Sequence, residues 1–160
     1  MYVLQVYTGR ENLIRVNLPG ALAPSEDRLE RRGGRIRTVR RVLIPGYVFL
    51  DVPEITAEAY YSARRIPGVL AFLGGGLRPE PMPPDEAEYI RILSNGGSPL
   101  EASDVLQEGG TVEVVRGPLK GMEGRIVRAD RRAMRVTVEL SMYGRARRVS
   151  LSANFLRSAR

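Results

Sequence analysis

The last fifty residues restrict the fold of this chain most strongly, because their apolar residues occur in short clusters separated by turns. Between residues 134 and 140, apolar and polar side chains alternate with a period of two, which is typical of a half-buried strand. The apolar positions there are Met134, Val136, Val138 and Leu140. Similar clusters occupy residues 112–115, 126–127, 149–151 and 155–156. Short strands at this spacing predict a small five-stranded β-barrel.

The first part of the chain has a different pattern, in which candidate strands and helices alternate irregularly. Strands are expected at residues 2–7, 47–52 and 69–73, and helices at residues 11–18, 56–65 and 83–95. An exposed hairpin is expected over residues 26–42, around Gly33-Gly34. This mixture predicts an α+β fold, with a mixed or antiparallel sheet flanked by helices.

A change of composition separates these two parts. Residues 94–110 contain the sequences Ser-Asn-Gly-Gly-Ser-Pro and Gln-Glu-Gly-Gly, which are typical of a linker. The sequence therefore predicts an N-terminal domain over residues 1–95, a linker over residues 96–108 and a C-terminal domain over residues 109–160.

The charge of the chain is unevenly distributed. The whole chain has 25 Lys and Arg against 18 Asp and Glu, a net charge of +7. Residues 111–160 hold 12 basic and 4 acidic residues, and residues 28–41 hold seven Arg and one Glu. Two such concentrations of positive charge indicate a polyanionic partner, most simply a nucleic acid.

The chain contains no Cys and no His, and this absence excludes several kinds of chemistry. Disulfides, zinc fingers and catalysis by Cys or His are excluded, and only carboxylate sites for Mg²⁺ or Ca²⁺ stay open. Gly74-Gly75-Gly76 lacks the Lys-Ser/Thr pair of a phosphate-binding loop. We expect no enzymatic activity, no cofactor and no metal. With no apolar run of 18 residues and no signal-peptide features, a cytoplasmic protein with no membrane contact is expected.

The strongest local motif is a glycine-rich turn over residues 117–124. Gly117, Gly121 and Gly124 allow a backbone with positive φ or close approach, and Pro118 stiffens the turn. The segment, which includes Lys120, resembles the KOW motif of transcription elongation factors and some ribosomal proteins. A tight connection between strands without a function of its own is the alternative.

A second turn of the C-terminal part has a surface suited to RNA. We expect the turn over residues 141–145 to expose Met142 and Tyr143 beside several arginines. An aromatic ring beside guanidinium groups can stack on unpaired bases, while the guanidinium groups bind phosphates. The basic residues around this turn are Arg131, Arg132, Arg145, Arg147 and Arg148. Tyr143 could instead cap the barrel.

Two groups of residues in the N-terminal part each allow a structural and a functional interpretation. Ile44, Tyr47 and Phe49 form either a buried strand or, if they face solvent, an apolar docking patch. Arg64 and Arg65 stand at the end of a predicted helix, where they complement the helix dipole or contact phosphate.

Taken in order, four motifs resemble those of the NusG family of bacterial transcription elongation factors. They are residues 2–12, Pro45-Gly46-Tyr47-Val48, Ile66-Pro67-Gly68-Val69 with Phe72-Leu73-Gly74, and the glycine-rich turn. Within the family, that turn and the basic C-terminal third most resemble the specialised LoaP-type paralogues. The resemblance implies an N-terminal NGN domain and an SH3-like C-terminal KOW barrel.

The resemblance also implies partners for particular residues. In the family, the NGN domain binds RNA polymerase through the β′ clamp helices and contacts the β subunit. The matching apolar residues are Tyr7, Ile44, Tyr47, Phe49 and Phe72. Arg64 and Arg65 match positions near the non-template DNA strand. Met1 and Ile44 depart from the family, which often has Trp and Phe there.

For the KOW domain, the resemblance implies one of three partners. LoaP-type proteins promote antitermination and are thought to bind an RNA hairpin, whereas general members reach the termination factor Rho or a ribosomal protein. The implied RNA-binding residues are Lys120, Arg131, Arg132, Met142, Tyr143, Arg145, Arg147 and Arg148. We therefore expect a monomeric antitermination factor that binds RNA polymerase and a nascent RNA hairpin. A general NusG and a ribosome-associated KOW protein are the alternatives, and the Val-rich strand pattern favours a constitutive barrel over a helical stored form.

Overall fold

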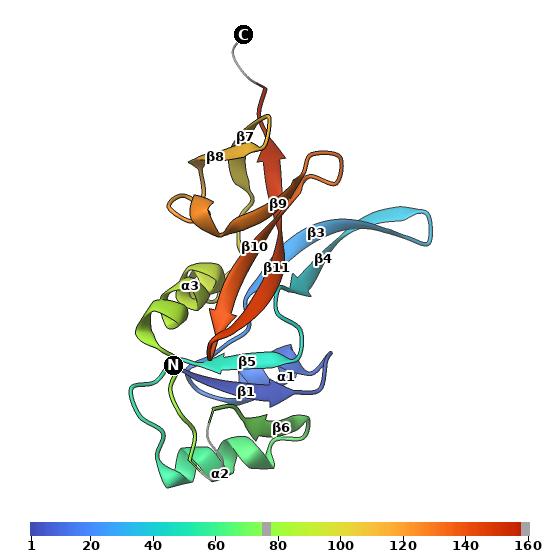
Figure 1. The fold of residues 1–160 in the computed structure, drawn as a ribbon. Coiled ribbons are helices and arrows are strands. Elements are labelled where there is room, and N and C mark those ends of the chain that lie inside the picture. The colour runs from blue at the N-terminus through green and yellow to red at the C-terminus, as the bar shows by residue number, and fades with distance from the viewer. Residues whose placement is uncertain (75–77, 158–160) are drawn as a thin grey trace. The chain divides into compact units, whose positions relative to one another are not determined.

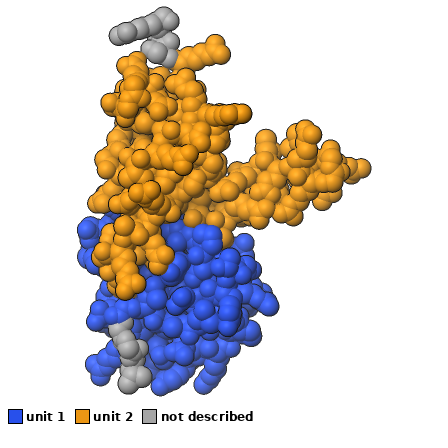
Figure 2. All heavy atoms as spheres, turned by 45° about the vertical axis from the view of Figure 1, so that its right-hand side comes forward, with its two compact units in different colours: residues 1–24, 44–97 blue, residues 25–43, 98–160 orange. Residues whose placement is uncertain are grey.

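The computed structural model describes residues 1–74 and 78–157. The chain forms two compact units, shown in different colours in Figure 2. Unit 1 comprises residues 1–24 and 44–97, and unit 2 comprises residues 25–43 and 98–160. The chain therefore passes between the units at residues 24–25, 43–44 and 97–98, and not at one linker alone.

Unit 1 contains a four-stranded antiparallel sheet with the strand order β2-β5-β1-β6 (Figure 1). The strands are β1 (Tyr2–Val6), β2 (Ala21–Leu22), β5 (Tyr47–Leu50) and β6 (Val69–Phe72). The helices are α1 (Glu11–Asn17), α2 (Ala57–Arg65) and α3 (Pro84–Ser94), followed by the 3₁₀ turn η1 (Asn95–Gly97). The expected strands and helices are confirmed, with ends shifted by one or two residues.

The core of unit 1 follows from side-chain alternation along its strands. Leu4 of β1 and Val48 of β5 are directly paired and fully buried, and they pack with Ile14 of α1 and Ala63 of α2. Helix α2 begins at a capped position, because the Thr56 hydroxyl accepts a hydrogen bond from the Ala59 N–H at 3.1 Å. The two helices thus cover one face of the sheet with apolar side chains.

Unit 2 contains a curled five-stranded sheet with the order β8-β7-β11-β10-β9. Its strands are β7 (Ser103–Glu108), β8 (Thr111–Arg116), β9 (Ile126–Asp130), β10 (Arg135–Met142) and β11 (Arg145–Phe155), with the 3₁₀ turn η2 (Glu123–Arg125). Strand β11 pairs antiparallel with β10 and parallel with β7. Unit 2 also includes the antiparallel hairpin β3 (Ser25–Arg32) and β4 (Arg35–Val42), which confirms the expected hairpin.

The five strands of the barrel are not the five that the apolar clusters suggested. Strand β7 lies in the segment expected to be a linker, and residues 145–155 form one strand where two were expected. Strand β7 is held by backbone pairing with β8 and β11, and Val105 is buried in the core. Asp104 adds hydrogen bonds from Arg116 of β8 at 2.7 Å and from Asn154 of β11 at 3.0 Å, although the sequence of the strand has a weak apolar pattern.

The core of unit 2 follows the predicted alternation of β10. Val136, Val138 and Leu140 are buried, and the residues between them are half-buried. Met134 does not continue this pattern: it has a φ of +55° in the preceding turn and is half exposed. Because it lies before the strand begins, the period of two does not apply to its side chain.

Candidate functional site

The apolar residues expected to bind RNA polymerase do not share one face of the unit 1 sheet. Paired residues of antiparallel strands lie on the same face. Phe49 is paired with Val3, and Tyr47 with Gln5, whereas Phe72 is paired with Leu4 on the core face.

Their exposure differs as well. Ile44 and Phe49 are buried, Tyr47 and Phe72 are half-buried, and the Tyr7 side chain is 61% exposed. The Phe72 ring stacks on the Tyr60 ring of α2, with centroids 5.1 Å apart. Tyr7 is therefore the one exposed aromatic residue of this predicted set.

A buried carboxylate that the sequence analysis did not single out holds the loop before Tyr47. Glu11, at the start of α1, is 3% exposed. It accepts hydrogen bonds from the N–H of Gly9 at 2.9 Å and from the N–H of Gly46 at 3.0 Å. Glu11 thus joins α1 to the Pro45-Gly46 turn, and an acidic residue two positions after Gly9 in the 2–12 motif was the available signal.

Arg64 and Arg65 lie in the last turn of α2, as expected, and both are exposed. The Arg64 guanidinium donates a hydrogen bond to the Tyr60 hydroxyl at 3.0 Å and lies 5.8 Å from the centre of its ring. Arg65 lines a shallow hollow between α1 and α2, together with Leu13 and Pro67. The helix dipole and the exposure of both residues fit the two interpretations equally.

The glycine-rich turn has a structural role in the barrel. Leu119 and Met122 are buried, and the Leu119 N–H donates to the Ser103 hydroxyl at 3.0 Å. The Lys120 ammonium donates to the Val114 carbonyl at 3.0 Å, which holds it against its own turn. The turn therefore closes the barrel with apolar side chains and folds Lys120 back.

The predicted RNA-binding residues of unit 2 are spread over more than one face. Met142 is only 3% exposed, because it continues the inward alternation of Val136 and Leu140 along β10, and the expectation of an exposed Met142 is corrected. Tyr143 is half-buried at the turn, with a φ of +51°.

The arginines of this set are exposed, but they come from two hairpins. Arg131 donates to the Gln107 carbonyl at 3.4 Å and lies 5.9 Å from the centre of the Phe155 ring, and Arg132 follows it in the turn before β10. On β11, Arg148 donates to Glu139 at 3.3 Å. Arg145 and Arg147 lie on the opposite side of the strand from Arg148, since successive side chains alternate.

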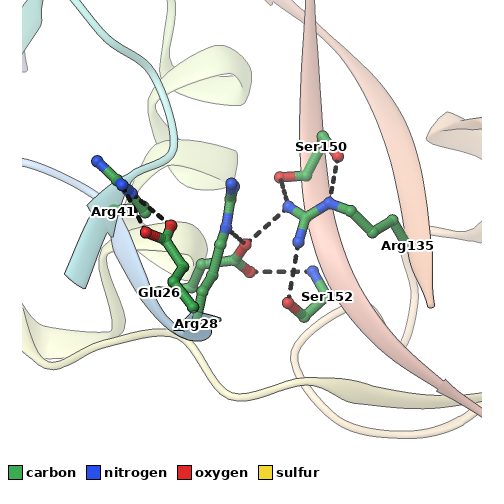
Figure 3. A network of polar contacts seen from close by, with 7 residues as sticks. Glu26, Arg28, Arg41, Arg135, Ser150 and Ser152 are labelled. Atoms are coloured by element: carbon green, nitrogen blue, oxygen red, sulfur yellow. Dashed lines mark hydrogen bonds and ion pairs between the residues drawn. The ribbon is translucent and has the colours of Figure 1, made fainter. Parts of the chain in front are cut away.

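A network around Glu26 joins the β3–β4 hairpin to the barrel of unit 2 (Figure 3). One carboxylate oxygen of Glu26 accepts hydrogen bonds from Arg28 and from Arg135 of β10, each at 2.7 Å. The other accepts from the N–H of Ser152 of β11 at 2.9 Å. Arg135 also donates to the Ser150 hydroxyl at 2.7 Å.

This network determines the ionisation of Glu26, which is 2% exposed. Burial opposes the charged form, but the hydrogen bonds from Ser152, Arg135 and Arg28 outweigh burial and lower the pKa of Glu26 below its ordinary value. Glu26 therefore stays ionised and bound to Arg135 at neutral pH. No local sequence pattern indicates the link from Glu26 to Arg135, because it joins residues more than one hundred positions apart.

In the described ranges 1–74 and 78–157, no group of three or more acidic side chains is placed to hold a metal ion. None of the helices described is long and apolar enough to cross a membrane.

Comparison with known proteins identifies both halves of the chain. Residues 1–91 match the family model "Transcription termination factor nusG", and residues 108–139 match the KOW motif. The chain is 31% identical to the transcription termination/antitermination protein NusG of Bacillus subtilis, over 94% of this chain and 93% of that protein. It is 34% identical to the NusG protein of Thermus thermophilus, over 81% of this chain and 75% of that protein. A solved structure of Thermotoga maritima NusG has a similar fold, with a TM-score of 0.60 and 24% identity over 94% of this chain and 92% of that one.

Proposed function

The chain belongs to the NusG family of transcription termination and antitermination factors, and from this premise we propose that it acts as a processive antitermination factor of the LoaP type. In this proposal, unit 1 binds RNA polymerase at the β′ clamp helices and the β subunit, with Arg64 and Arg65 near the non-template DNA strand. Unit 2 binds a hairpin of the nascent RNA. Proteins of this family are transcription factors and not enzymes.

The distribution of charge between the units carries this proposal. Residues 111–160, which hold all the proposed RNA-binding residues, have 12 basic and 4 acidic residues, a net charge of +8, whereas unit 1 holds 6 basic and 8 acidic residues, a net charge of −2. A protein partner such as Rho or a ribosomal protein does not require so much positive charge. An RNA backbone attracts it, because each phosphate contact releases a condensed counterion.

The two units would act together by different physical effects. Binding of unit 1 to the closed, elongating form of RNA polymerase would favour that form, since a ligand shifts an equilibrium towards the state it binds better. RNA captured by unit 2 would then be held by an intramolecular contact, at an effective concentration far above that of free protein. Pausing and termination, which require the clamp to open, would be suppressed.

The first prediction concerns RNA binding by the exposed Arg131-Arg132 pair. We expect the R131Q/R132Q variant of the full chain to bind a leader-RNA hairpin more weakly than wild type, with the slope of log K against log salt reduced by about 1.5. The matched control is R64Q/R65Q, which removes two adjacent exposed arginines from unit 1 and should leave hairpin affinity unchanged. Electrophoretic titration at physiological salt, with a single-stranded RNA of equal length for comparison, measures both.

Three results would reject the proposal that unit 2 binds an RNA hairpin. One is hairpin binding no tighter than that of the single strand, and another is equal weakening by the two variants. Binding to a purified ribosomal protein or Rho without preference for RNA would instead establish a general NusG.

The second prediction concerns polymerase binding by Tyr7. Exposed aromatic residues commonly dominate protein interfaces, so Tyr7→Ala should weaken binding to RNA polymerase by about 2 kcal/mol, roughly thirtyfold. Tyr61→Ala is a close control, because the Tyr61 side chain is 59% exposed and that of Tyr7 is 61% exposed. Surface plasmon resonance on immobilised polymerase distinguishes them. If the wild-type protein did not bind RNA polymerase, the alternative of a ribosome-associated KOW protein would be favoured.

A further inference from the structure

The β3–β4 hairpin, residues 25–43, is a strongly basic arm whose role the proposed function leaves open. It holds seven arginines, and in Figure 2 it projects from the rest of unit 2. The arginines between residues 31 and 40 are all exposed, namely Arg31, Arg32, Arg35, Arg37 and Arg40. The arm therefore presents its charge to solvent and to any partner that approaches its tip.

Strand register places most of these arginines on one face of the arm. Directly paired residues share a face, and the pairs Glu26–Arg41, Arg28–Val39, Glu30–Arg37 and Arg32–Arg35 alternate with pairs on the other face. We call the first set the arginine face: Arg28, Arg32, Arg35, Arg37 and Arg41. The opposite face carries Arg31 and Arg40 among exposed apolar and polar side chains such as Leu29 and Ile36.

The base and the tip of the arginine face differ in their pairing. Near the base, Arg41 donates two hydrogen bonds to Glu30, at 2.7 and 2.6 Å, and Arg28 binds Glu26. Towards the tip, Arg35 and Arg37 have no hydrogen bond or ion pair to any residue that the structure describes. Their guanidinium donors are thus available to an outside partner.

The arrangement at the tip costs stability in the free protein. Arg32 and Arg35 are directly opposite each other across the two strands, and like charges in that position destabilise a β-hairpin. A bound polyanion would remove this repulsion. The Glu30 carboxylate, 3.6 Å from the Arg32 guanidinium, offsets part of this repulsion, but Arg35 has no such partner among the described residues.

The composition of the arm selects the kind of polyanion. Residues 25–43 contain no Phe, Tyr, Trp or His, so the arm cannot stack on unpaired bases in the way that single-strand binders do. A two-stranded β-ribbon fits between the phosphate backbones in the major groove of B-form DNA, whereas the major groove of A-form RNA is too deep and narrow to admit it. We propose that the arginine face of the β3–β4 arm is a binding site for double-stranded DNA.

The dimensions of the arm agree with such a site. The four residue pairs nearest the turn span about 10 Å at the rise of a β-strand. Duplex DNA carries one phosphate charge for about every 1.7 Å of its axis, so several phosphates lie within reach of Arg32, Arg35 and Arg37. The contact uses the phosphates and needs no particular base sequence.

The Glu26 network lies at the base of the arm and also favours binding by the arm. Glu26 lies on the arginine face at the base and binds Arg135 and Ser152 of the barrel. The arm is therefore anchored to a folded sheet through a buried carboxylate. An anchored arm loses less conformational entropy on binding than a free loop would.

The test compares two double variants of the full chain that change the same arm by the same charge. R35Q/R37Q alters the arginine face, and R31Q/R40Q alters the opposite face. Binding to a 20-base-pair DNA duplex of mixed sequence is followed by fluorescence anisotropy between 50 and 200 mM salt. We expect the salt slope of R35Q/R37Q to be smaller by about 1.8, so that wild type loses about tenfold more affinity than this variant over the range. R31Q/R40Q should behave as wild type.

Several outcomes would overturn the proposal. Equal losses in the two variants would mean that net charge alone matters, and unchanged binding in R35Q/R37Q would place the DNA contact elsewhere. Tighter binding to an RNA duplex of the same sequence would assign the arm to RNA. Circular dichroism of each variant confirms that the hairpin is folded, and titration of R35Q/R37Q with the leader-RNA hairpin separates this site from the RNA site proposed for Arg131 and Arg132.

Discussion

Replacement of Gly117 by alanine is expected to lower the free energy of unfolding of unit 2 by on the order of 3 kcal/mol. Gly117 has a φ of +115°, a conformation that residues with a Cβ atom rarely adopt. A Cβ atom built there would lie 2.6 Å from the Cα of Ser103 and 2.7 Å from its hydroxyl oxygen. Because Ser103 is part of strand β7, the clash cannot be relieved by turning a side chain alone.

Gly121→Ala is the matched control for this prediction. Gly121 lies in the same turn with a φ of +88°, but a Cβ atom there meets nothing within 4 Å. The Gly121→Ala substitution should lower the free energy of unfolding by about 1 kcal/mol, because it imposes a positive φ on alanine without adding a clash. Hydrogen exchange of peptides from β7 and β8 measures both variants locally. Equal protection in the two would show that positive φ, and not the contact with Ser103, determines the glycine at 117.

Removal of the Glu26 carboxylate is expected to have an effect of similar size. Glu26→Ala leaves Arg135, whose side chain is 22% exposed, without its carboxylate partner, and loss of one member of a buried ion pair costs about 3 kcal/mol. The hairpin should then lose its anchor, so hydrogen exchange should increase in residues 25–43 as well as in the facing strands β10 and β11. The double variant E26A/R135M should cost less than the sum of the single variants, since it leaves no charge unpaired.

The same carboxylate predicts a dependence of stability on pH. Because folding lowers the pKa of Glu26 from its ordinary value of 4.5, its ionised form stabilises unit 2 fully above that pH. This stabilisation is lost as the pH falls through the lower pKa of the folded state. Urea denaturation of wild type and E26Q should therefore differ at pH 7 and converge in acid. Glu30→Gln is the control, because the hydrogen bonds from Arg41 also lower the pKa of Glu30, but this pair lies at the surface, where an ion pair contributes little to stability. A constant difference between wild type and E26Q down to pH 2 would contradict this account.

Local patterns predicted most of the secondary structure. The alternation in residues 136–140 indicated strand β10, the Pro-Pro-Asp-Glu sequence indicated the start of α3, and Gly33-Gly34 indicated the turn of the arm. These features depend on near neighbours in the chain, so they can be recognised in its sequence. Strand β7 could not, because it has few apolar residues and is held by pairing with β8 and with β11, a strand that is distant in the sequence.

The sequence indicates which residues have side chains suited to binding a partner, but not which of these residues lie together on one exposed surface. The sequence placed Tyr47, Phe49 and Phe72 on strands, but the pairing of Phe72 with Leu4 places its ring on the core face. In the same way, Met142 belongs to the buried side of β10. Strand register determines the face of each side chain, and register is set by contacts between segments distant in the chain.

The sequence by itself determined the family, the two kinds of fold and the concentration of arginine in two segments, since these depend on composition and local order. Only the tertiary structure decided that both basic segments belong to one unit, because the arm at residues 25–43 and the barrel at residues 98–160 are joined through Glu26 and Arg135. The physical reason is the range of the interaction. A buried carboxylate must find donors wherever the fold brings them, and here they come from residues that no local pattern connects with it.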